Sequence, residues 1–312
     1  MNNSREIKCV AIVGTGVIGA SWAAELLAKG LDVSAYDPAP GAEERLREYV
    51  DGAWPALTQL GLDPTASVDR LRFSADLAEA LDGADFVQEN GPERQDIKIE
   101  TYAKLDELTA ADVILASSSS GLTISPIQEG CQHPERCLIG HPFNPPHLIP
   151  LVEVVGGDKT SPEAIQTAMN FYTAIGKHPI HVRKELPGHV ANRLQAALWR
   201  EIVYLVDEGV VSVADADAAV SWGPGLRWGA MGPIMLTNLG AGAAGGLRTM
   251  LDHLGGPIES WWESLGNPTV HTDEMKDKLA DGVIEAAAGR SLEEIAAERD
   301  RVLLGLLALR NK

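Results

Sequence analysis

The sequence predicts an α/β fold: a mostly parallel sheet of the Rossmann type followed by an all-helical C-terminal domain. Between Lys8 and about Val155, short apolar runs alternate with stretches of helical periodicity, as in βαβ units whose sheet is covered on both faces. The glycine-rich run GTGVIG, residues 14–19, directly follows the first apolar run. Strand patterns largely stop after about residue 188, where helical spacing takes over.

Six apolar runs predict the strands of the sheet in chain order. Short apolar runs bounded by polar or glycine-containing segments are typical of strands buried in a parallel sheet. A helical stretch at residues 43–59 is longer than a minimal crossover needs and contains Trp54-Pro55, so we interpret it as an excursion that could border the active site. The predicted strands are residues 9–13, 32–36, 84–89, 112–117, 137–140 and 151–155.

The segment RKELPGH, residues 183–189, ends the strand-rich half with a Pro-Gly pair. We therefore predict two domains, residues 1–187 and 188–312. Ser212 is expected to begin a helix, and Ser291 with Glu294 forms the capping-box pattern of the last helix. Glycine-rich stretches, GPGLRWGAMGP and GAGAAGG, lie between these helices. The first helix of this half is predicted from a helical repeat that ends at Gly209, a C-cap: Val190, Leu194, Leu198, Ile202 and Leu205.

Composition and charge exclude several classes of partner. The chain has 312 residues, of which 45% are hydrophobic and 22% charged, the balance of a globular protein. Its formal net charge of −18 would repel nucleic acid and anionic lipid. No apolar run reaches the roughly 18 residues of a membrane span, and the start, MNNSREIKCV, has no signal-peptide pattern, so we expect a cytoplasmic protein.

Three cysteines are predicted to be free thiols, and no metal site is expected. Their odd number and their spacing fit neither a disulfide framework nor a zinc site. They are Cys9, Cys131 and Cys137.

The glycine-rich run predicts a dinucleotide site because it lies between a strand and a helix. Gly14 permits a tight turn, Gly16 allows the backbone to approach a pyrophosphate, and Gly19 allows close packing of the helix on the sheet. The helix that opens at Val17 and Ile18 supplies amide donors and a partial positive charge. The alternative is a tight turn without a ligand. An FAD site is disfavoured because the sequence contains no second flavin-type motif.

Asp37 predicts NAD rather than NADP as the cofactor. It ends the second predicted strand, 23 residues after Gly14, where a carboxylate accepts hydrogen bonds from ribose hydroxyls and repels a 2′-phosphate. Residues 38–41, PAPG, contain no arginine or lysine to bind that phosphate. The alternative is an Asp37 that is only a solvated strand end.

His141 and Glu153 are candidates for an acid–base pair. His141 leaves a predicted strand, and Glu153 lies 12 residues on within LVEVV, an otherwise apolar strand. A buried acid needs a hydrogen-bond partner, and an imidazole oriented by a carboxylate suits removal of the proton from a secondary alcohol during hydride transfer. Spacing alone leaves a purely structural histidine equally open.

The sequence resembles the 3-hydroxyacyl-CoA dehydrogenase superfamily over essentially the whole chain. The motifs that carry the resemblance are SSSSGL at residues 117–122, GHPFNPP from residue 140, LVEVV from residue 151 and PGHVANR at residues 187–193. The resemblance implies an NAD-dependent enzyme that oxidises the 3-hydroxyl of its substrate, and a homodimer built through the helical domain. The apolar last helix, with Leu303, Leu304, Leu306 and Leu307, is compatible with such a dimer or with a monomer core.

The resemblance also implies a role for each site residue. His141 is the general base and Glu153 its orienting partner. Ser120 and Asn192 donate hydrogen bonds to the substrate oxygen, and Glu93 with Lys98 flanks the nicotinamide ribose. Each of these residues could instead have a purely structural role: Ser120 could cap its own turn, Asn192 could be a helix N-cap, and Glu93 with Lys98 could be a surface pair.

Several stretches, among them AYDPAPGAEERLR, WPALTQLGL and GPGLRW, resemble the carnitine 3-dehydrogenase branch, with the L-gulonate 3-dehydrogenase and lambda-crystallin branch also near. Between residues 31 and 97 there is no lysine, and five arginines face 15 acidic residues, which disfavours the phosphates of a coenzyme A thioester. An acidic surface would instead attract a trimethylammonium group, which aromatic faces can bind. The aromatic candidates, each also a candidate for the core, are Phe143, Trp222, Trp228, Trp261 and Trp262.

The expected reaction is therefore NAD-dependent oxidation of a small 3-hydroxy acid, carnitine first. Phe143, Gly188 and Trp228 are predicted to contact the substrate. His189 replaces a bulky apolar residue of the carnitine branch, and GPIMLTNLGAGAAGG carries extra small residues, so the accepted head group could differ. The alternatives are 3-hydroxybutyryl-CoA or L-gulonate as substrate, and a crystallin-like NAD-binding protein without activity.

Overall fold

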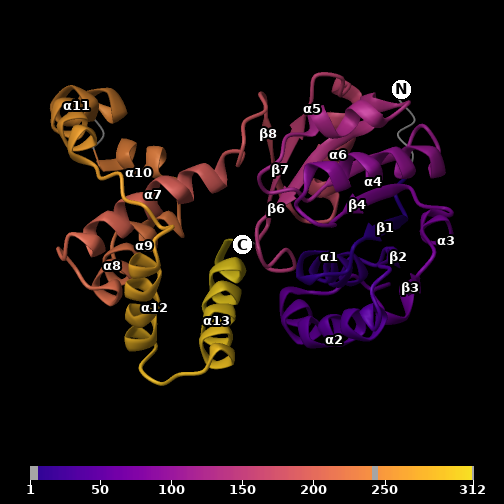
Figure 1. Ribbon diagram of the computed structural model, residues 1–312, viewed down its shortest axis with the longest axis horizontal. Helices are drawn as coiled ribbons and strands as arrows, with labels where there is room; N and C mark the ends of the chain where they lie inside the picture. Colours follow the sequence, from indigo (N-terminus) through magenta and orange to yellow (C-terminus); the bar gives the residue numbers. More distant parts are fainter. Residues whose placement is uncertain (1–5, 241–244, 311–312) are drawn as a thin grey trace. The chain divides into compact units, whose positions relative to one another are not determined.

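The computed structural model describes residues 6–240 and 245–310 of the chain. The chain divides into two compact units, Met1–Asn192 and Arg193–Lys312 (Figure 1). Residues 241–244, which belong to the small-residue stretch GAGAAGG, lie outside the described residues.

One sheet organises the first unit. Among the described residues it has eight strands in the order β3-β2-β1-β4-β5-β6-β7-β8. β7 pairs antiparallel with β6, β8 pairs parallel with β7, and every other neighbouring pair is parallel, which confirms the predicted mostly parallel sheet. The strands are β1 (Cys9–Val13), β2 (Asp32–Tyr36), β3 (Leu71–Ser74), β4 (Phe86–Glu89), β5 (Ile114–Ser117), β6 (Cys137–Pro142), β7 (Leu151–Gly156) and β8 (His178–Val182).

Helices cover both faces of this sheet because its central strands are apolar on both sides. Along β1, Val10 and Ile12 belong to one buried cluster, and Ala11 and Val13 belong to the other. The first cluster packs against α1 (Val17–Ala28), α2 (Ala42–Leu60) and α6 (Pro162–Ala174). The second packs against α3 (Leu77–Leu81), α4 (Gln95–Leu108) and α5 (Ile124–Ile127). Short 3₁₀ turns complete the unit: η1 (Val68–Arg70), η2 (Gln128–Gly130) and η3 (Pro134–Arg136).

The predicted strands all form, with changes at their ends. β1 and β2 match residue for residue, β4 and β5 each begin two residues later than predicted, and β6 continues through His141 to Pro142. β3 and β8, at the two edges of the sheet, were not predicted. The predicted helix at residues 43–59 is α2, which contains Pro55 and whose Trp54 packs against the core.

The described part of the second unit is helical. Ser212 caps α8 by accepting the N–H of Asp215, and Ser291 and Glu294 form the predicted capping box, each side chain accepting the other's backbone N–H. Gly209 has φ +67° at the end of α7, as predicted for a C-cap. The helices are α7 (Ala191–Asp207), α8 (Val213–Ser221), α9 (Pro224–Trp228), α10 (Pro233–Gly240), α11 (Gly246–Ser264), α12 (Asp273–Ala287) and α13 (Leu292–Arg310).

Few apolar side chains of this helical unit are buried. Of the four leucines singled out on α13, Leu304 is buried, Leu306 is exposed, and the other two lie between. Among the described residues, no helix is both long and apolar enough to cross a membrane. Within residues 193–240 and 245–310, the buried apolar residues are Val203, Val206, Ala216, Met275 and Leu304.

Candidate active site

The glycine run forms the turn between β1 and α1. Gly14 has φ +87°, and a Cβ there would lie 2.9 Å from the backbone of Asn90. A Cβ on Gly19 would lie 1.9 Å from the carbonyl oxygen of Gly14. A Cβ on Gly16 would meet no protein atom within 4 Å, so the fold itself does not require glycine there. The backbone at Gly16 is instead open to close approach by a bound group, which fits a dinucleotide pyrophosphate.

This difference predicts opposite outcomes for two alanine variants. We expect Gly16→Ala to keep the free energy of unfolding within about 0.5 kcal/mol of wild type, yet to raise the Kd for NADH at least about tenfold. Gly19→Ala should lose about 2 kcal/mol or more of stability because its Cβ meets backbone. Urea unfolding and NADH fluorescence titration measure the two quantities. A Gly16→Ala variant with wild-type NADH affinity would contradict the proposed role.

Asp37 holds the turn of the glycine loop. Its Oδ2 accepts hydrogen bonds from the N–H (2.8 Å) and the hydroxyl (3.1 Å) of Thr15, and its Oδ1 accepts from Ala39 N (2.9 Å). It lines an open hollow of about 640 Å³ together with residues 38–44, Arg47, Phe73 and Ala75. The N-terminal part of α2 therefore borders the hollow next to Asp37.

Arg47 of α2 lines this hollow, and Arg45 bonds to Pro40, which also lines it, although residues 38–41 themselves contain no basic residue. Arg47 donates to Glu43 Oε1 (2.8 Å), and Arg45 donates to the carbonyl oxygen of Pro40 (3.0 Å). Both guanidinium groups therefore have partners within the protein. They lie nine and eleven residues after Tyr36, the last residue of β2, so a pattern local to the strand end does not reveal them.

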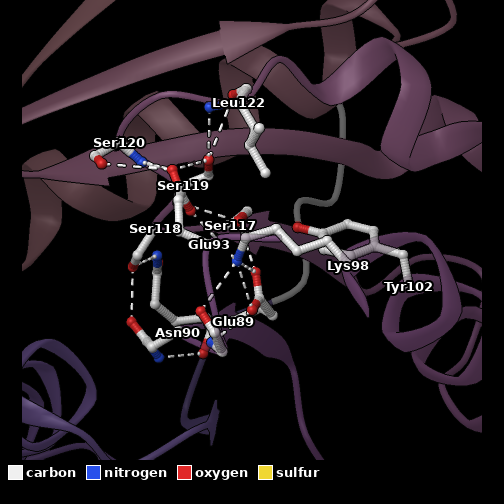
Figure 2. Close-up of polar contacts among 12 residues, drawn as sticks. Glu89, Asn90, Glu93, Lys98, Tyr102, Ser117, Ser118, Ser119, Ser120 and Leu122 are labelled. Carbon is white, nitrogen blue, oxygen red and sulfur yellow. Dashed lines mark hydrogen bonds and ion pairs between the residues drawn. The ribbon is translucent and has the colours of Figure 1, made fainter. Parts of the chain in front are cut away.

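Beside the glycine loop, Lys98 of α4 is buried against Glu89 at the end of β4. Lys98 Nζ lies 2.9 Å from both carboxylate oxygens of Glu89, and the same carboxylate accepts from Ser117 Oγ (2.6 Å) and Gly91 N (2.5 Å). Figure 2 shows Lys98 between Glu89 and Glu93. Glu93 Oε2 is 3.9 Å away from Lys98 Nζ, so the predicted pair is present, but Glu89 is the closer partner of the lysine.

Glu93 organises the serine run that follows β5. Its Oε1 accepts from Ser119 Oγ (2.8 Å), Ser120 N (2.9 Å) and Gly121 N (2.8 Å). Burial opposes ionisation of Glu93, but these hydrogen bonds and the Lys98 charge outweigh it and lower the pKa of the carboxyl. An anionic Glu93 thus fixes the backbone on which Ser120 is carried.

A second chain of hydrogen bonds fixes the strand that carries His141. Gln88 Nε2 donates to the carbonyl oxygen of Gly140 (3.1 Å) and to Ser118 Oγ (2.7 Å), while Gln88 Oε1 accepts from Tyr172 (2.6 Å). Gly140 is required at this point, because a Cβ there would lie 2.0 Å from the Tyr172 hydroxyl. The position of β6 just before His141 is therefore tightly determined.

His141 and Glu153 are paired in the interior. They face each other across the antiparallel β6–β7 ladder, and His141 Nδ1 lies 2.8 Å from Glu153 Oε2. The second oxygen of Glu153 accepts the N–H groups of Val190 (2.9 Å) and Ala191 (3.0 Å) at the start of α7. Burial opposes ionisation of Glu153, but the hydrogen bonds from His141, Ala191 and Val190 outweigh it and lower the pKa of the carboxyl. Because a carboxylate only accepts hydrogen bonds, Nδ1 of His141 carries a proton and Nε2 of the neutral ring is the basic atom.

His189 is a third buried group at this site, and its contacts were not predicted from the sequence. Its ring centroid lies 5.3 Å from that of His141, and its Nε2 donates to the carbonyl oxygen of Ser119 (3.0 Å). Its Nδ1 is buried without a partner among the described residues. Burial is the main cause that lowers the pKa of His189, and the nearby His141 lowers it further. The hydrogen bond to Ser119 and the charges of Glu153 and Glu93 act in the opposite direction but do not outweigh burial.

Asn192 and Ser120 lie in contact with each other. Asn192 Nδ2 donates to the carbonyl oxygen of Ser120 (3.0 Å), which ties the first turn of α7 to the serine run. Gly188, with φ +75°, turns the chain into this segment, and its N–H donates to Gly121 (3.4 Å). Phe143 packs edge-on to His141, with ring centroids 5.7 Å apart.

The other aromatic candidates lie on the helical unit and are not core residues of it. Trp228, at the end of α9, is 38% exposed, and the three others are more exposed still. Among the described residues, no group of three His, Cys, Asp or Glu side chains is arranged to hold a metal ion. The more exposed tryptophans are Trp222, Trp261 and Trp262.

The glycine turn, the Glu89 network, the serine run and His141 all lie at one edge of the sheet. They follow β1, β4 and β5, or end β6, and these four strands are parallel neighbours. The carboxyl edge of such a sheet is where ligands of doubly wound folds bind. Glu89 and Gln88 were not predicted as site residues, although two polar residues at the end of the apolar run ADFVQE could have indicated them.

Comparison with known proteins gives the family. The model of the 3-hydroxyacyl-CoA dehydrogenase NAD binding domain matches residues 9–186, and that of the 3-hydroxyacyl-CoA dehydrogenase C-terminal domain matches residues 188–285. The L-carnitine dehydrogenase of Pseudomonas putida is 48% identical over 302 residues, which cover 97% of this chain and 94% of that protein. The L-carnitine dehydrogenase of Streptomyces griseus is 49% identical over 302 residues, covering 97% of this chain and 90% of that protein.

Among solved structures, that of a 5-formyl-3-hydroxy-2-methylpyridine 4-carboxylic acid 5-dehydrogenase, an NAD⁺-dependent dismutase, superposes with a TM-score of 0.83. It is 34% identical and covers 96% of this chain and 97% of its own. The resemblance drawn from the sequence motifs is therefore confirmed: the chain belongs to the 3-hydroxyacyl-CoA dehydrogenase family.

Proposed function

We propose that this protein is an NAD-dependent dehydrogenase that oxidises the 3-hydroxyl of L-carnitine to 3-dehydrocarnitine. The observation that carries the chemistry is the buried pair of His141 and Glu153, 2.8 Å apart at the sheet edge that also bears the glycine turn. The near full-length similarity to L-carnitine dehydrogenases supports the substrate.

His141 acts as the general base in the proposed mechanism. Its Nδ1 is committed to Glu153, so Nε2 takes the proton of the substrate hydroxyl. The ionised Glu153 holds the ring in this tautomer and stabilises the imidazolium that forms, while the N–H groups of Val190 and Ala191 hold Glu153. NAD, when bound, supplies the acceptor for the hydride from carbon 3.

Ser120 and Asn192 orient the substrate oxygen by donating hydrogen bonds to it. Their mutual contact and the anchoring of Ser120 by Glu93 support this role, since a fixed donor loses less entropy when the substrate binds. Phe143 and Gly188 are proposed to line the substrate site beside His141, and a contact of Trp228 with substrate stays a prediction. In the first unit, Gly14, Gly16, Gly19 and Asp37 would hold the dinucleotide, with Glu93 and Lys98 next to its nicotinamide ribose.

A small cationic substrate suits the charges better than a coenzyme A thioester does. All five arginines between residues 31 and 97 already bond to groups of this protein: Arg45 to Pro40, Arg47 to Glu43, Arg70 to Asp32, Arg72 to Ser34 and Asp82, and Arg94 to Asp96. A nucleotide phosphate that bound there would have to compete with these contacts for the guanidinium groups.

We also propose a cytoplasmic homodimer with residues 1–187 as the cofactor domain and residues 188–312 as the substrate and dimerisation domain. Large apolar side chains exposed on the helical unit support its use as an interface, since single chains rarely expose so many. The most exposed of them are Trp222, Ile284, Leu292 and Leu309.

A substrate panel tests the proposed function. NADH formation is measured with L-carnitine, L-gulonate, 3-hydroxybutyrate and 3-hydroxybutyryl-CoA, and we expect kcat/KM for L-carnitine to exceed the others at least about tenfold. Turnover of 3-hydroxybutyryl-CoA without that of L-carnitine would reverse the assignment, and its KM should then rise with salt as phosphate contacts weaken. NADH binding without turnover of any member would indicate a crystallin-like protein.

A further inference from the structure

Two of the three cysteines, which are six residues apart in the sequence, lie next to each other in the structure. Cys131 follows η2, Cys137 opens β6, and their sulfur atoms lie 3.7 Å apart. The Cys137 thiol donates toward Cys131 Sγ, with the carbonyl oxygen of His133 as a second acceptor at 3.9 Å. All three cysteines are free thiols, as predicted, and Cys9 lies on β1, away from this pair.

The segment between the two thiols is held by a buried ion pair. Arg136 Nη2 lies 2.7 Å from Asp106 Oδ1, and the other oxygen of Asp106 accepts the N–H groups of Gln132 (2.5 Å) and His133 (3.1 Å). The N–H of Cys131 donates to Gln128 (3.1 Å). These contacts fix the backbone on both sides of the pair, so the thiols face each other in the folded protein without a rearrangement of the chain.

The two thiols differ in exposure and acidity. Cys131 is half-buried, and the hydrogen bond from Cys137 lowers the pKa of its thiol, helped by the charges of Arg136 and Lys159 against burial. Cys137 is buried, and donation of its hydrogen bond to Cys131, together with burial, raises the pKa of its thiol. A more acidic, accessible thiol beside a protected one is the arrangement of an attacking and a resolving cysteine.

We propose that Cys131 and Cys137 form a reversible oxidation site, which closes to an intramolecular disulfide when the protein meets a hydroperoxide. The Cys131 thiolate attacks the peroxide oxygen, an S–O bond forms, the O–O bond breaks, and hydroxide leaves as water after taking a proton. The Cys137 sulfur then displaces the oxygen from Cys131: the S–S bond forms, the S–O bond breaks, and the thiol proton leaves with that oxygen as water. Two electrons pass from the sulfurs to hydrogen peroxide, which becomes two waters.

The disulfide would protect Cys131 without stopping the enzyme. Closure removes the sulfenic acid before a second peroxide converts it irreversibly to the sulfinic acid. Cys137 and His141 lie at opposite ends of β6, about 13 Å apart along a strand that rises about 3.3 Å per residue. We therefore expect the oxidised enzyme to keep its activity within about twofold.

Peptide mapping of the peroxide-treated full chain tests the proposal, because Arg136 lies between the two cysteines. Trypsin releases Cys131 in residues 105–136, Cys137 in residues 137–159 and Cys9 in residues 9–29. We expect the first two peptides to be disulfide-linked, the intact mass to fall by about 2 Da, and dithiothreitol to restore both thiols. In the Cys137→Ser variant, Cys131 should instead gain about 16 Da or a dimedone adduct, whereas Cys9→Ser should behave as wild type.

The measurement on the wild-type chain remains a test even if Cys137→Ser fails to fold. Three results with the wild-type chain would overturn the proposal: accumulation of the dimedone adduct or sulfinic acid at Cys131 with no linked peptide, a linked peptide that contains Cys9, or a link only between two chains. Three unreacted thiols at peroxide concentrations that oxidise free cysteine would overturn it equally.

Discussion

Replacement of His141 by alanine is expected to lower kcat by about 10⁴-fold, the upper range for loss of a general base, while the Kd for NADH stays within about twofold of wild type. Within this pair, Nε2 of His141 is the atom left to accept the substrate proton, because His141 Nδ1 and two backbone N–H groups donate to Glu153 and lower the pKa of its carboxyl. The structure describes no contact between the His141 imidazole and the glycine turn that would bind the dinucleotide, so the Kd for NADH should change little. Stopped-flow and steady-state assays with L-carnitine measure the first quantity and fluorescence titration the second.

Two controls separate this chemistry from a general effect of losing a histidine. His181→Asn removes an exposed histidine on β8 of the same sheet and should leave kcat unchanged. Added imidazole should restore part of the activity of His141→Ala, because a small base can occupy the space that the ring leaves. Ordinary turnover by His141→Ala, with NADH bound normally, would show that the base is another group.

The interior strands could be predicted from the sequence, and the edge strands could not. β1 and β2 follow from apolar runs because both of their faces are covered by helices. β3 includes Arg72, and β8 includes the exposed histidines His178 and His181, so neither shows a continuous apolar run. A strand at a sheet edge pairs on one side only, and its sequence is correspondingly less constrained.

The site was predictable where one residue stood out from its own segment. Glu153 was conspicuous as an acid inside an apolar strand, and the antiparallel register of β6 and β7 then places it opposite His141. The contact of Lys98 with Glu89 depends on how α4 packs back over the end of β4, which no local pattern reports. The contact between His189 and His141 likewise required the fold, although the sequence had marked His189 as a departure from its relatives.

Replacement of Glu153 by glutamine is expected to lower kcat about 10³-fold, somewhat less than loss of the base itself, because Glu153 acts through His141 rather than on the substrate. An amide can still accept the N–H groups of Val190 and Ala191, but it cannot neutralise the imidazolium. The acid limb of the kcat/KM profile should therefore move to lower pH, a change that a merely structural defect would not produce. Glu153→Asp keeps the charge with a shorter reach and should lie between glutamine and wild type.

Stability against pH gives an independent check on the same carboxylate. The pKa of Glu153 is lowered in the folded protein, so its ionised form contributes stability above its unfolded pKa of about 4.5. That contribution disappears as the pH falls through the lower folded value, where both states bind the proton. The free energy of unfolding of Glu153→Gln should thus lie below that of wild type at pH 7, and the gap should narrow in urea titrations below about pH 4.5. A gap that is constant from pH 7 to pH 3 would mean that shape, not charge, is what Glu153 contributes, and the imidazolium would then need another counter-charge.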